Sequence, residues 1–277
     1  MKIGVVGCKG FVGEAVCELF KTSDEVELVE YDNGKKYGTP IGTREAINDC
    51  DIVFVCVPSP MKEDGSCDTS IVDEVVRWIN GPIIVIKSTV PPGTTDWLRV
   101  KYGKNIVHNP EFLTEANYID DIKNANRTVL GGEEYICDMV VVAYQKVYSD
   151  EMIYVITDSS TSELSKYALN TFLATKVAYF NELKNIADVF SVNFDELREI
   201  VLLDKRIGDS HTEVTKERGF GGHCFPKDLN GLINACFDVE YSPNLLMEVW
   251  ESNRDCREEF KDEKYNFYNK DENEIFS

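Results

Sequence analysis

The sequence lacks the features that mark secreted, membrane-spanning and zinc-binding proteins. It has no Cys-x-x-Cys pair, no His and Cys cluster at zinc spacing, and no apolar run near the about 20 residues of a membrane span. Its first residues form a strand pattern instead of a signal peptide. The nine cysteines are an odd set without paired spacing. We therefore expect reduced thiols, a cytoplasmic protein, no metal site and no membrane partner.

Basic residues are scarce relative to acidic ones. The chain carries 29 Lys and Arg against 49 Asp and Glu, which gives a net charge of −20. Nucleic acid and anionic membranes have the same sign as this surface and are excluded as partners. Any bound phosphate therefore needs a local site. At 277 residues, 43% of them apolar, the chain is long enough for two domains or one large α/β domain.

A glycine-rich loop follows an apolar strand pattern at residues 1–7. A strand, a glycine loop and a helix pattern in this order place backbone N–H groups and a helix N-terminus around a pyrophosphate. The first two glycines stand one residue further apart than in the usual dinucleotide fingerprint. The expected cofactor contacts in this loop are Gly7, Gly10, Phe11, Val12 and Gly13.

A second strand pattern, residues 26–32, ends in acids about twenty residues after the loop, where an acceptor for a ribose 2′-hydroxyl belongs. Glu30 or Asp32 would favour NAD over NADP, because a carboxylate repels a 2′-phosphate. The alternative is an ordinary strand–helix–strand unit with acidic residues at a strand end.

Near-continuous β-branched runs recur along the first half of the chain, separated by helix patterns. Such runs indicate strands that are buried on both faces of a sheet, and hence a parallel, doubly wound sheet. Ligands bind such sheets at the carboxyl ends of the strands. The further strands are expected at residues 51–57, 82–87, 105–108, 127–130 and 152–156.

Three polar loops follow these strands. Because loops at the carboxyl ends of strands carry function, we take Thr89 and Glu115 from these loops as site candidates. Turn residues alone do not indicate a site. These loops are candidates because each of them follows a predicted strand.

A long helix is predicted from residue 161 to residue 190. Ser160 and Glu163 stand at the spacing of a capping box, and no Gly or Pro interrupts the pattern that follows. Lys166 and Asn170 lie one turn apart on a single helix face. They form either a functional pair or part of a solvated surface.

A decapeptide, Gly219-Phe-Gly-Gly-His-Cys-Phe-Pro-Lys-Asp228, contains the strongest candidate nucleophile. Three glycines in four positions allow a tight backbone turn, and Cys224 stands directly after them. A thiolate is the reactive form of cysteine, and Lys227 or a helix start near Asp228 would stabilise it. His223 is a further titratable neighbour. The alternative is a glycine-rich turn with a small buried cysteine.

These patterns predict an α/β protein in two parts. Residues 1–157 form an NAD-binding domain with a Rossmann-like sheet, and residues 158–260 form a mainly helical domain around the long helix. Residues 261–277 are a charged tail without an apolar period.

The sequence resembles the UDP-glucose/GDP-mannose dehydrogenase family, in its UDP-glucose 6-dehydrogenase branch. The resemblance rests on five ordered motifs between residue 1 and about residue 255. They are Lys87-Ser-Thr-Val-Pro-Pro-Gly-Thr94, Asn109-Pro-Glu-Phe-Leu-Thr-Glu115, Glu163-Leu-Ser-Lys-Tyr-Ala-Leu-Asn170, Arg206-Ile-Gly208 and the decapeptide.

The resemblance implies a two-step, four-electron oxidation of the C6 alcohol of a nucleotide sugar, UDP-glucose, to a carboxylate with two NAD. It implies that Cys224 carries a thiohemiacetal and then a thioester, which water cleaves. The helix that corresponds to residues 161–190 joins the domains in the family and forms a dimer core, so a homodimer is expected.

Residue roles follow from the matching motif positions. The implied catalytic residues are Cys224, Lys166, Asn170, Asp228, Glu115 and Thr89, of which Lys166 and Asn170 hold an oxyanion. Pro58, Thr89, Glu115 and Lys227 are implied cofactor contacts. The implied substrate contacts are Phe112, Leu113, Lys166, Asn170, Arg206, Phe220, Gly221 and Gly222.

The sequence departs from the family pattern at the longer glycine loop and at His223, where many members have serine. Typical members also carry a third, nucleotide-binding domain, and we expect a short form without it. The alternatives are a GDP-mannose or UDP-N-acetyl-hexosamine 6-dehydrogenase, or a non-catalytic protein that binds NAD or a nucleotide sugar.

Overall fold

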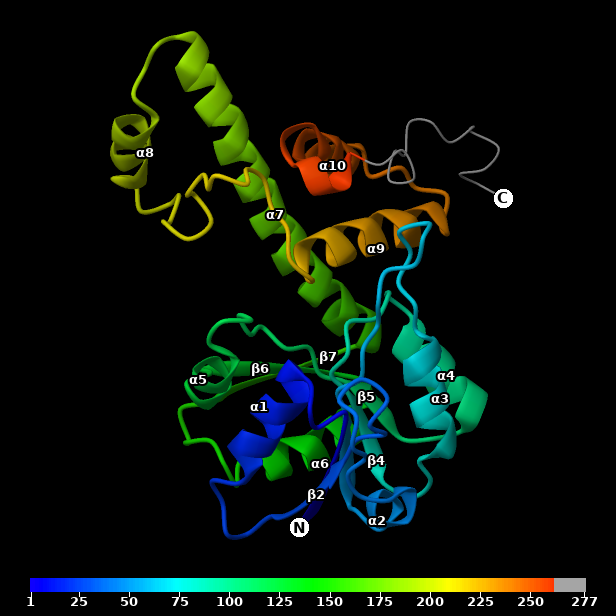
Figure 1. The fold of residues 1–277 in the computed structure, drawn as a ribbon. Coiled ribbons are helices and arrows are strands. Elements are labelled where there is room, and N and C mark those ends of the chain that lie inside the picture. Colours follow the sequence, from blue (N-terminus) through cyan, green and yellow to red (C-terminus); the bar gives the residue numbers. More distant parts are fainter. Residues whose placement is uncertain (262–277) are drawn as a thin grey trace. The chain divides into compact units, whose positions relative to one another are not determined.

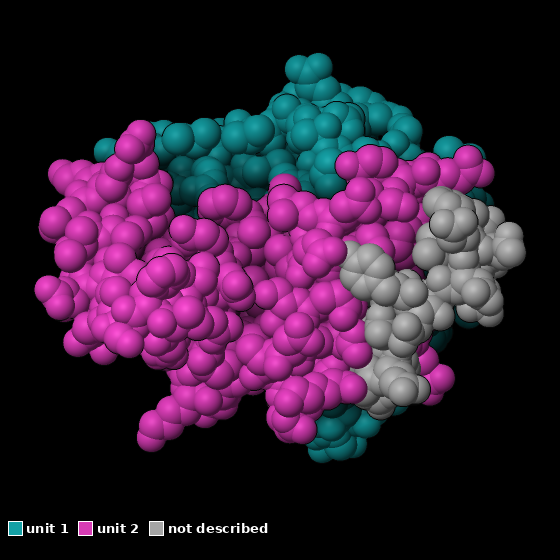
Figure 2. All heavy atoms as spheres, turned by 90° about the horizontal axis from the view of Figure 1, so that it is seen from above, with its two compact units in different colours: residues 1–60, 68–166 teal, residues 61–67, 167–277 magenta. Residues whose placement is uncertain are grey.

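The computed structural model describes residues 1–261, and the chain divides into two compact units (Figure 2). Unit 1 comprises Met1–Pro60 and Asp68–Lys166, and unit 2 comprises Met61–Cys67 and Tyr167–Ser277. The units divide at residue 166, whereas the sequence placed a domain boundary at residue 157. The expected charged tail lies, from residue 262, outside the described residues.

Unit 1 is built on a seven-stranded sheet in the order β2-β1-β3-β4-β5-β6-β7 (Figure 1). The strands are β1 (Lys2–Val6), β2 (Glu27–Tyr31), β3 (Ile52–Val55), β4 (Ile83–Ile86), β5 (Ile106–His108), β6 (Arg127–Gly131) and β7 (Ile153–Thr157). The helices are α1 (Phe11–Phe20), α2 (Arg44–Asn48), α3 (Ser70–Trp78), α4 (Thr94–Tyr102), α5 (Tyr118–Lys123) and α6 (Glu134–Tyr144). The predicted α/β, Rossmann-like fold is confirmed.

One strand pair departs from the parallel arrangement that the sequence predicted. β5 and β6 are antiparallel and pair through their last residues, His108 and Gly131, while the other neighbouring strands are parallel. Antiparallel neighbours need no crossover helix over the sheet. The connection between them carries the short α5, which packs against α1.

Buried side chains form one core on each face of the sheet. Phe54 of β3 packs with α1 and α6, whereas its neighbours Val53 and Val55 pack with α3 and α4. This alternation follows from the pleat of a strand, which directs successive side chains to opposite faces. It explains why the strand sequences are apolar throughout.

The long helix α7 (Ser159–Val189) starts in unit 1 and continues into unit 2, which otherwise contains α8 (Phe194–Leu202), α9 (Phe225–Phe237), α10 (Asn244–Cys256) and the 3-10 helix η1 (Glu258–Phe260). The core of unit 2 joins α7, α9 and α10 around Trp250, Leu229 and Ala174. The long helix expected over residues 161–190 is present as α7.

The predicted capping box of the long helix is wrong. The N–H and the hydroxyl of Thr161 donate to the carboxylate of Asp158, at 2.8 and 2.6 Å, so Asp158 satisfies the first turn. The carboxylate of Glu163 is engaged elsewhere in unit 1.

Residues Met61–Cys67 form a small hairpin that belongs to unit 2 although unit 1 precedes and follows it in the chain. Met61 and Cys67 make an antiparallel bridge, and the N–H of Lys62 donates to the carbonyl of Ser66 at 2.8 Å. Gly65 (φ +86°) packs against α9, where a Cβ would lie 3.0 Å from Nδ2 of Asn234.

None of the helices within residues 1–261 combines the length and apolar character that a membrane span requires.

Candidate active site

The glycine loop of unit 1 opens the N-terminus of α1. Gly7 has φ +85°, and the N–H of Gly10 donates to the carbonyl of Gly7 at 3.1 Å, which closes a tight turn. Gly10 is the N-cap of α1 and supplies no side-chain cap. The additional residue of the loop is therefore contained in the Gly7–Gly10 turn, and the segment from Gly10 to Gly13 meets the helix as in a dinucleotide loop.

Gly13 allows the first turn of α1 to lie against the loop. A Cβ at this position would stand 2.1 Å from the carbonyl oxygen of Gly7 and 2.9 Å from Cα of Cys8. These distances are far below van der Waals contact, so only glycine fits.

The two acids at the end of β2 have different surroundings. Glu30 forms an ion pair at 3.0 Å with Lys21, the C-cap of α1. Asp32 is buried, and its carboxylate accepts the N–H of Gly34 at 2.8 Å. Because a cation already pairs with Glu30, Asp32 is the stronger candidate for recognising a ribose hydroxyl.

The other predicted residues of unit 1 follow the strands as expected. Thr89 is half-buried, and its neighbour Ser88 donates its hydroxyl to the carbonyl of Val57 at 2.6 Å, which fixes the start of the loop after β4. Pro58 directly follows Val57. Glu115 is exposed in the loop after β5.

The sequence interpretation did not select Glu111, which is half-buried and forms an ion pair with the buried Lys166 at 2.8 Å. The other carboxylate oxygen of Glu111 accepts a hydrogen bond from the N–H of Leu113 at 2.7 Å. Burial would raise the pKa of Glu111, but the Lys166 ammonium outweighs it and the pKa is lowered. The available sequence signal was its position in the loop that follows the buried strand β5, three residues after His108.

A second buried lysine, Lys87, lies close enough to this ion pair to interact with both of its charges. Lys87 donates to Oδ1 of Asn109 at 2.9 Å, and Asn109 donates in turn to Thr128 at 2.9 Å. Burial, together with the positive charge of Lys166, lowers the pKa of Lys87 to about 8. Burial and Lys87 lower the pKa of His108 to about 3, so its imidazole is neutral. These contacts hold the loop that carries Glu111.

In unit 2, Asn170 donates its amide to the carboxylate of Asp228 at 2.5 Å, and both side chains are buried. Lys227 forms an ion pair with the other carboxylate oxygen of Asp228. Burial would lower the pKa of Lys227, but Asp228, with smaller contributions from Cys67 and Cys224, raises it. Lys227 is therefore an ammonium near the thiol of Cys224.

Cys224 is the N-cap of α9, and it is the one exposed cysteine in residues 1–261. The helix thus begins at Phe225, earlier than the start near Asp228 that the sequence suggested. A helix N-terminus and a nearby ammonium both stabilise a thiolate. The alternative interpretation, a glycine-rich turn with a small buried cysteine, is therefore wrong for Cys224.

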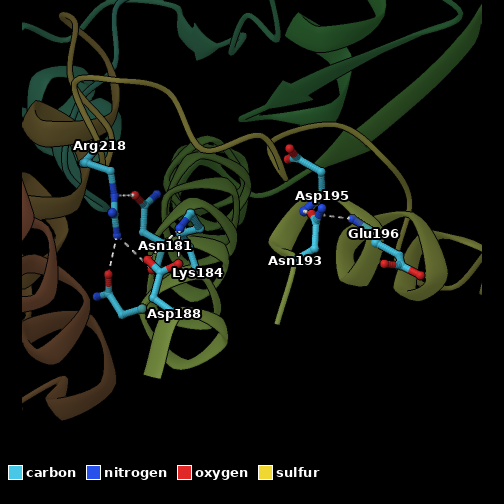
Figure 3. A network of polar contacts seen from close by, with 8 residues as sticks. Asn181, Lys184, Asp188, Asn193, Asp195, Glu196 and Arg218 are labelled. Carbon is cyan, nitrogen blue, oxygen red and sulfur yellow. Dashed lines mark hydrogen bonds and ion pairs between the residues drawn. The ribbon is translucent and has the colours of Figure 1, made fainter. Parts of the chain in front are cut away.

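The glycine turn before Cys224 is held to α7 and α10 by two asparagines. Arg218 donates to Oδ1 of Asn181 at 2.9 Å, as Figure 3 shows, and the N–H of Gly219 donates to the same oxygen at 3.0 Å. Asn253 accepts the N–H of Phe220 at 2.7 Å and donates to its carbonyl at 3.0 Å. The turn is therefore preorganised.

A cavity of about 360 Å³ adjoins this turn within unit 2. The predicted substrate contacts Phe220 and Gly221 line it, together with His211 and Arg198. Gly222 is exposed beside them. Arg206 lies apart from this lining: its guanidinium is 88% exposed and pairs with Asp204 at 2.5 Å.

The two remaining predicted substrate contacts, Phe112 and Leu113, lie in the loop after β5, where neighbouring side chains of unit 1 hold them. Leu113 is held through its N–H to Glu111, and the ring of Phe112 stacks on the guanidinium of Arg127 at 5.6 Å.

Comparisons with known proteins agree on one family. The NAD binding domain of the UDP-glucose/GDP-mannose dehydrogenase family matches residues 26–150, and its central domain matches residues 160–255. A UDP-glucose 6-dehydrogenase of Rickettsia typhi is 36% identical over 215 residues, which are 74% of this chain and 49% of that protein. The chain thus spans about half the length of the curated relatives it matches.

Solved structures show the same fold. A UDP-glucose dehydrogenase from the archaeon Pyrobaculum islandicum matches with a TM-score of 0.81 and 28% identity, over 91% of this chain and 68% of that one. A UDP-D-ManNAc dehydrogenase from Pyrococcus horikoshii matches with a TM-score of 0.79 at 23% identity, over 92% and 68% of the two chains.

Proposed function

The chain belongs to the UDP-glucose/GDP-mannose dehydrogenase family, and on this premise we propose that it oxidises the C6 alcohol of a nucleotide sugar to a carboxylate. The observation that supports this most directly is the exposed thiol of Cys224 at the N-terminus of α9, near the Lys227 ammonium. A protein that only binds nucleotides has no need of an activated thiol.

The cofactor is NAD, in agreement with the family domain that residues 26–150 match. The uncapped N-terminus of α1 and the close approach that Gly13 permits suit a pyrophosphate. NAD supplies the hydride acceptor for each of the two oxidations.

On this proposal the C6 alcohol first loses a hydride, which NAD would accept, and its hydroxyl proton, which gives the C6 aldehyde. The sulfur of Cys224 then adds to the carbonyl carbon of this aldehyde, and the oxygen takes up a proton to give a thiohemiacetal. Loss of a hydride and of the hydroxyl proton converts it into a thioester. Water then attacks the carbonyl, the C–S bond breaks, and the thiol and a carboxylate are released. From its capture until the carboxylate is released, the C6 carbon stays covalently bound to the sulfur of Cys224.

The other residues take roles that suit their chemistry. Lys166 and Asn170 stabilise the developing oxyanion, and Asp228 orients water and the Lys227 ammonium. Thr89 and Glu115 line the nicotinamide side. Because Glu111 already pairs with Lys166, we add it to the proposed catalytic residues.

UDP-glucose is the substrate we propose, because relatives that are 36% and 35% identical are named UDP-glucose 6-dehydrogenase. GDP-mannose and UDP-N-acetyl-hexosamines are the alternative substrates. Incubation of the protein with NAD and a panel of UDP- and GDP-sugars, with NADH followed by absorbance, tests this. Formation of two NADH per UDP-glucose supports the proposal, and no NADH with any sugar contradicts it.

The acids after the glycine loop predict a preference for NAD over NADP of at least tenfold, about 1.4 kcal/mol. Because Lys21 pairs with Glu30, we expect Asp32→Asn to reduce this preference and Glu30→Gln to leave most of it. Comparison of kcat/KM for NAD and NADP in the three proteins measures the effect. Equal use of both cofactors by the unaltered protein would show that neither acid repels the 2′-phosphate.

We also propose a homodimer that forms through α7. Phe172, Tyr179 and Ile186 recur at intervals of seven residues and are 67%, 59% and 44% exposed. Two helical turns separate each pair, so the three side chains lie along one face. Exposed apolar stripes of this kind mark association surfaces.

The double variant Phe172→Glu/Tyr179→Glu should convert the dimer to a monomer, because it places charges in an apolar contact. Val100→Glu is the matched control, since Val100 is 81% exposed on α4. Sedimentation velocity at micromolar concentration distinguishes the states. A monomeric unaltered protein, or a double variant that stays dimeric, would contradict this surface.

Buried free thiols at Cys8, Cys17, Cys50, Cys56 and Cys137 suit a reducing compartment, and we propose the cytoplasm.

A further inference from the structure

Glu163 is a fully buried carboxylate without a role in the proposed chemistry. It lies near the start of α7 and is 0% exposed. One oxygen accepts the N–H of Gly93 at 2.6 Å, and the other accepts the N–H and the hydroxyl of Thr95 at 2.7 and 2.6 Å. All of these residues belong to unit 1.

These three donor groups belong to the first residues of α4 and to its N-cap. The N-cap of α4 is Gly93, which has φ +91° and no side chain with which to cap the helix. Glu163 therefore supplies, from a distant part of the sequence, the acceptor that a Ser, Thr or Asp would normally provide. The carboxylate also sits at the positive end of the α4 dipole.

The loop between β4 and α4 is held at both ends. Ser88 bonds to the carbonyl of Val57 at its start, and Gly93 and Thr95 bond to Glu163 at its end. Thr89 lies between these anchors. On the same side of α7, one turn after Glu163, Lys166 pairs with Glu111.

We propose that Glu163 is a positioning residue that sets the loop bearing Thr89 in register with Lys166. This inference rests on the proposed dehydrogenase function, in which Thr89 and Lys166 belong to the reacting site. One helical turn then fixes two parts of the site together, and a displacement of about 1 Å is enough to lower turnover about a hundredfold.

The anchor is sensitive to protonation. Burial raises the pKa of Glu163 to about 7, against the hydrogen bonds from Thr95 and Gly93, and Asp96 of α4 raises it further. The imidazole of His108, which contacts the adjacent Ser162, is neutral near this pH, and Lys166 is paired with Glu111. Above pH 7 the ionised carboxylate accepts all three hydrogen bonds. Below pH 7 its proton removes an acceptor, and the anchor weakens.

The test compares Glu163→Gln with Glu134→Gln, which alters an exposed carboxylate in the first turn of α6. For Glu163→Gln we expect amide hydrogen exchange across residues 88–98 to accelerate at least tenfold, with other segments unchanged. We expect kcat to fall at least tenfold and KM for NAD and sugar to change less than threefold. The limb of the kcat profile that rises through about pH 7 should disappear in this variant.

Thr95→Val removes only the hydroxyl donor and should shift exchange and kcat in the same direction by a smaller factor. It keeps the test decisive if Glu163→Gln does not fold. Unchanged exchange at residues 88–98 in both variants would overturn the anchor, whatever the activity. If exchange accelerates in the variants as expected but the unaltered protein oxidises no sugar, the proposed function is overturned and the anchor stays in place.

Discussion

Cys224→Ser is expected to lower steady-state formation of NADH from UDP-glucose by at least a thousandfold. A serine hydroxyl is far less acidic than a thiol, so it neither captures the aldehyde readily nor forms an acyl group that water cleaves quickly. The exposed position of Cys224 at a helix N-terminus means that this substitution removes no buried packing. Thermal unfolding should therefore be nearly unchanged.

Cys236→Ser is the matched control, because Cys236 lies on the same helix and is half-buried. It should retain two NADH per sugar. Turnover of Cys224→Ser at the unaltered rate would contradict the covalent mechanism. So would release of free aldehyde with one NADH by the unaltered protein, which would indicate a simple alcohol dehydrogenase.

Gly13→Ala is expected to have the largest effect on stability. The new methyl group would lie 2.1 Å from the carbonyl oxygen of Gly7, and neither backbone segment can move without displacing α1 or β1. Overpacking against backbone should lower the free energy of unfolding by about 3 kcal/mol or more. A shift of the melting temperature by roughly −10 °C, with loss of NAD binding, is the measurable result.

Gly10→Ala separates steric strain in the fold from contact with the cofactor. The nearest atom to a Cβ at Gly10 is 3.6 Å away, and its φ of −84° suits any residue. We expect this variant to melt within a few degrees of the unaltered protein. If Gly13→Ala were as stable as Gly10→Ala, the close approach of the loop to α1 would be wrong.

The sequence predicted most of the fold, because burial on both faces makes each central strand a continuous apolar run. The glycine loop and the long helix carried equally local signals. The antiparallel β5–β6 pair was not predictable in this way, since the direction of a short strand leaves no mark on its composition. Only the chain path through the connection that carries α5 determines it.

The candidate site was predictable where a motif places chemistry on adjacent residues, as at Cys224, Lys227 and Asp228. Contacts between distant segments were not. The acceptor for α4 is Glu163, whose spacing after Ser160 indicated a cap for its own helix. The omission of Glu111 arose similarly, because its ion pair with Lys166 joins two segments that are distant in the sequence.

The hairpin Met61–Cys67 has a consequence for how this protein can be inherited or engineered. Two stretches of the gene, separated by the coding sequence for most of unit 1, together specify unit 2. A single recombination event near codon 167 would transfer α9 without the hairpin that packs on it through Gly65 and Asn234. A chimaera made at that point would pair a helix and a hairpin of different ancestry. Exchange of the intact unit therefore requires two additional crossovers that bracket codons 61–67.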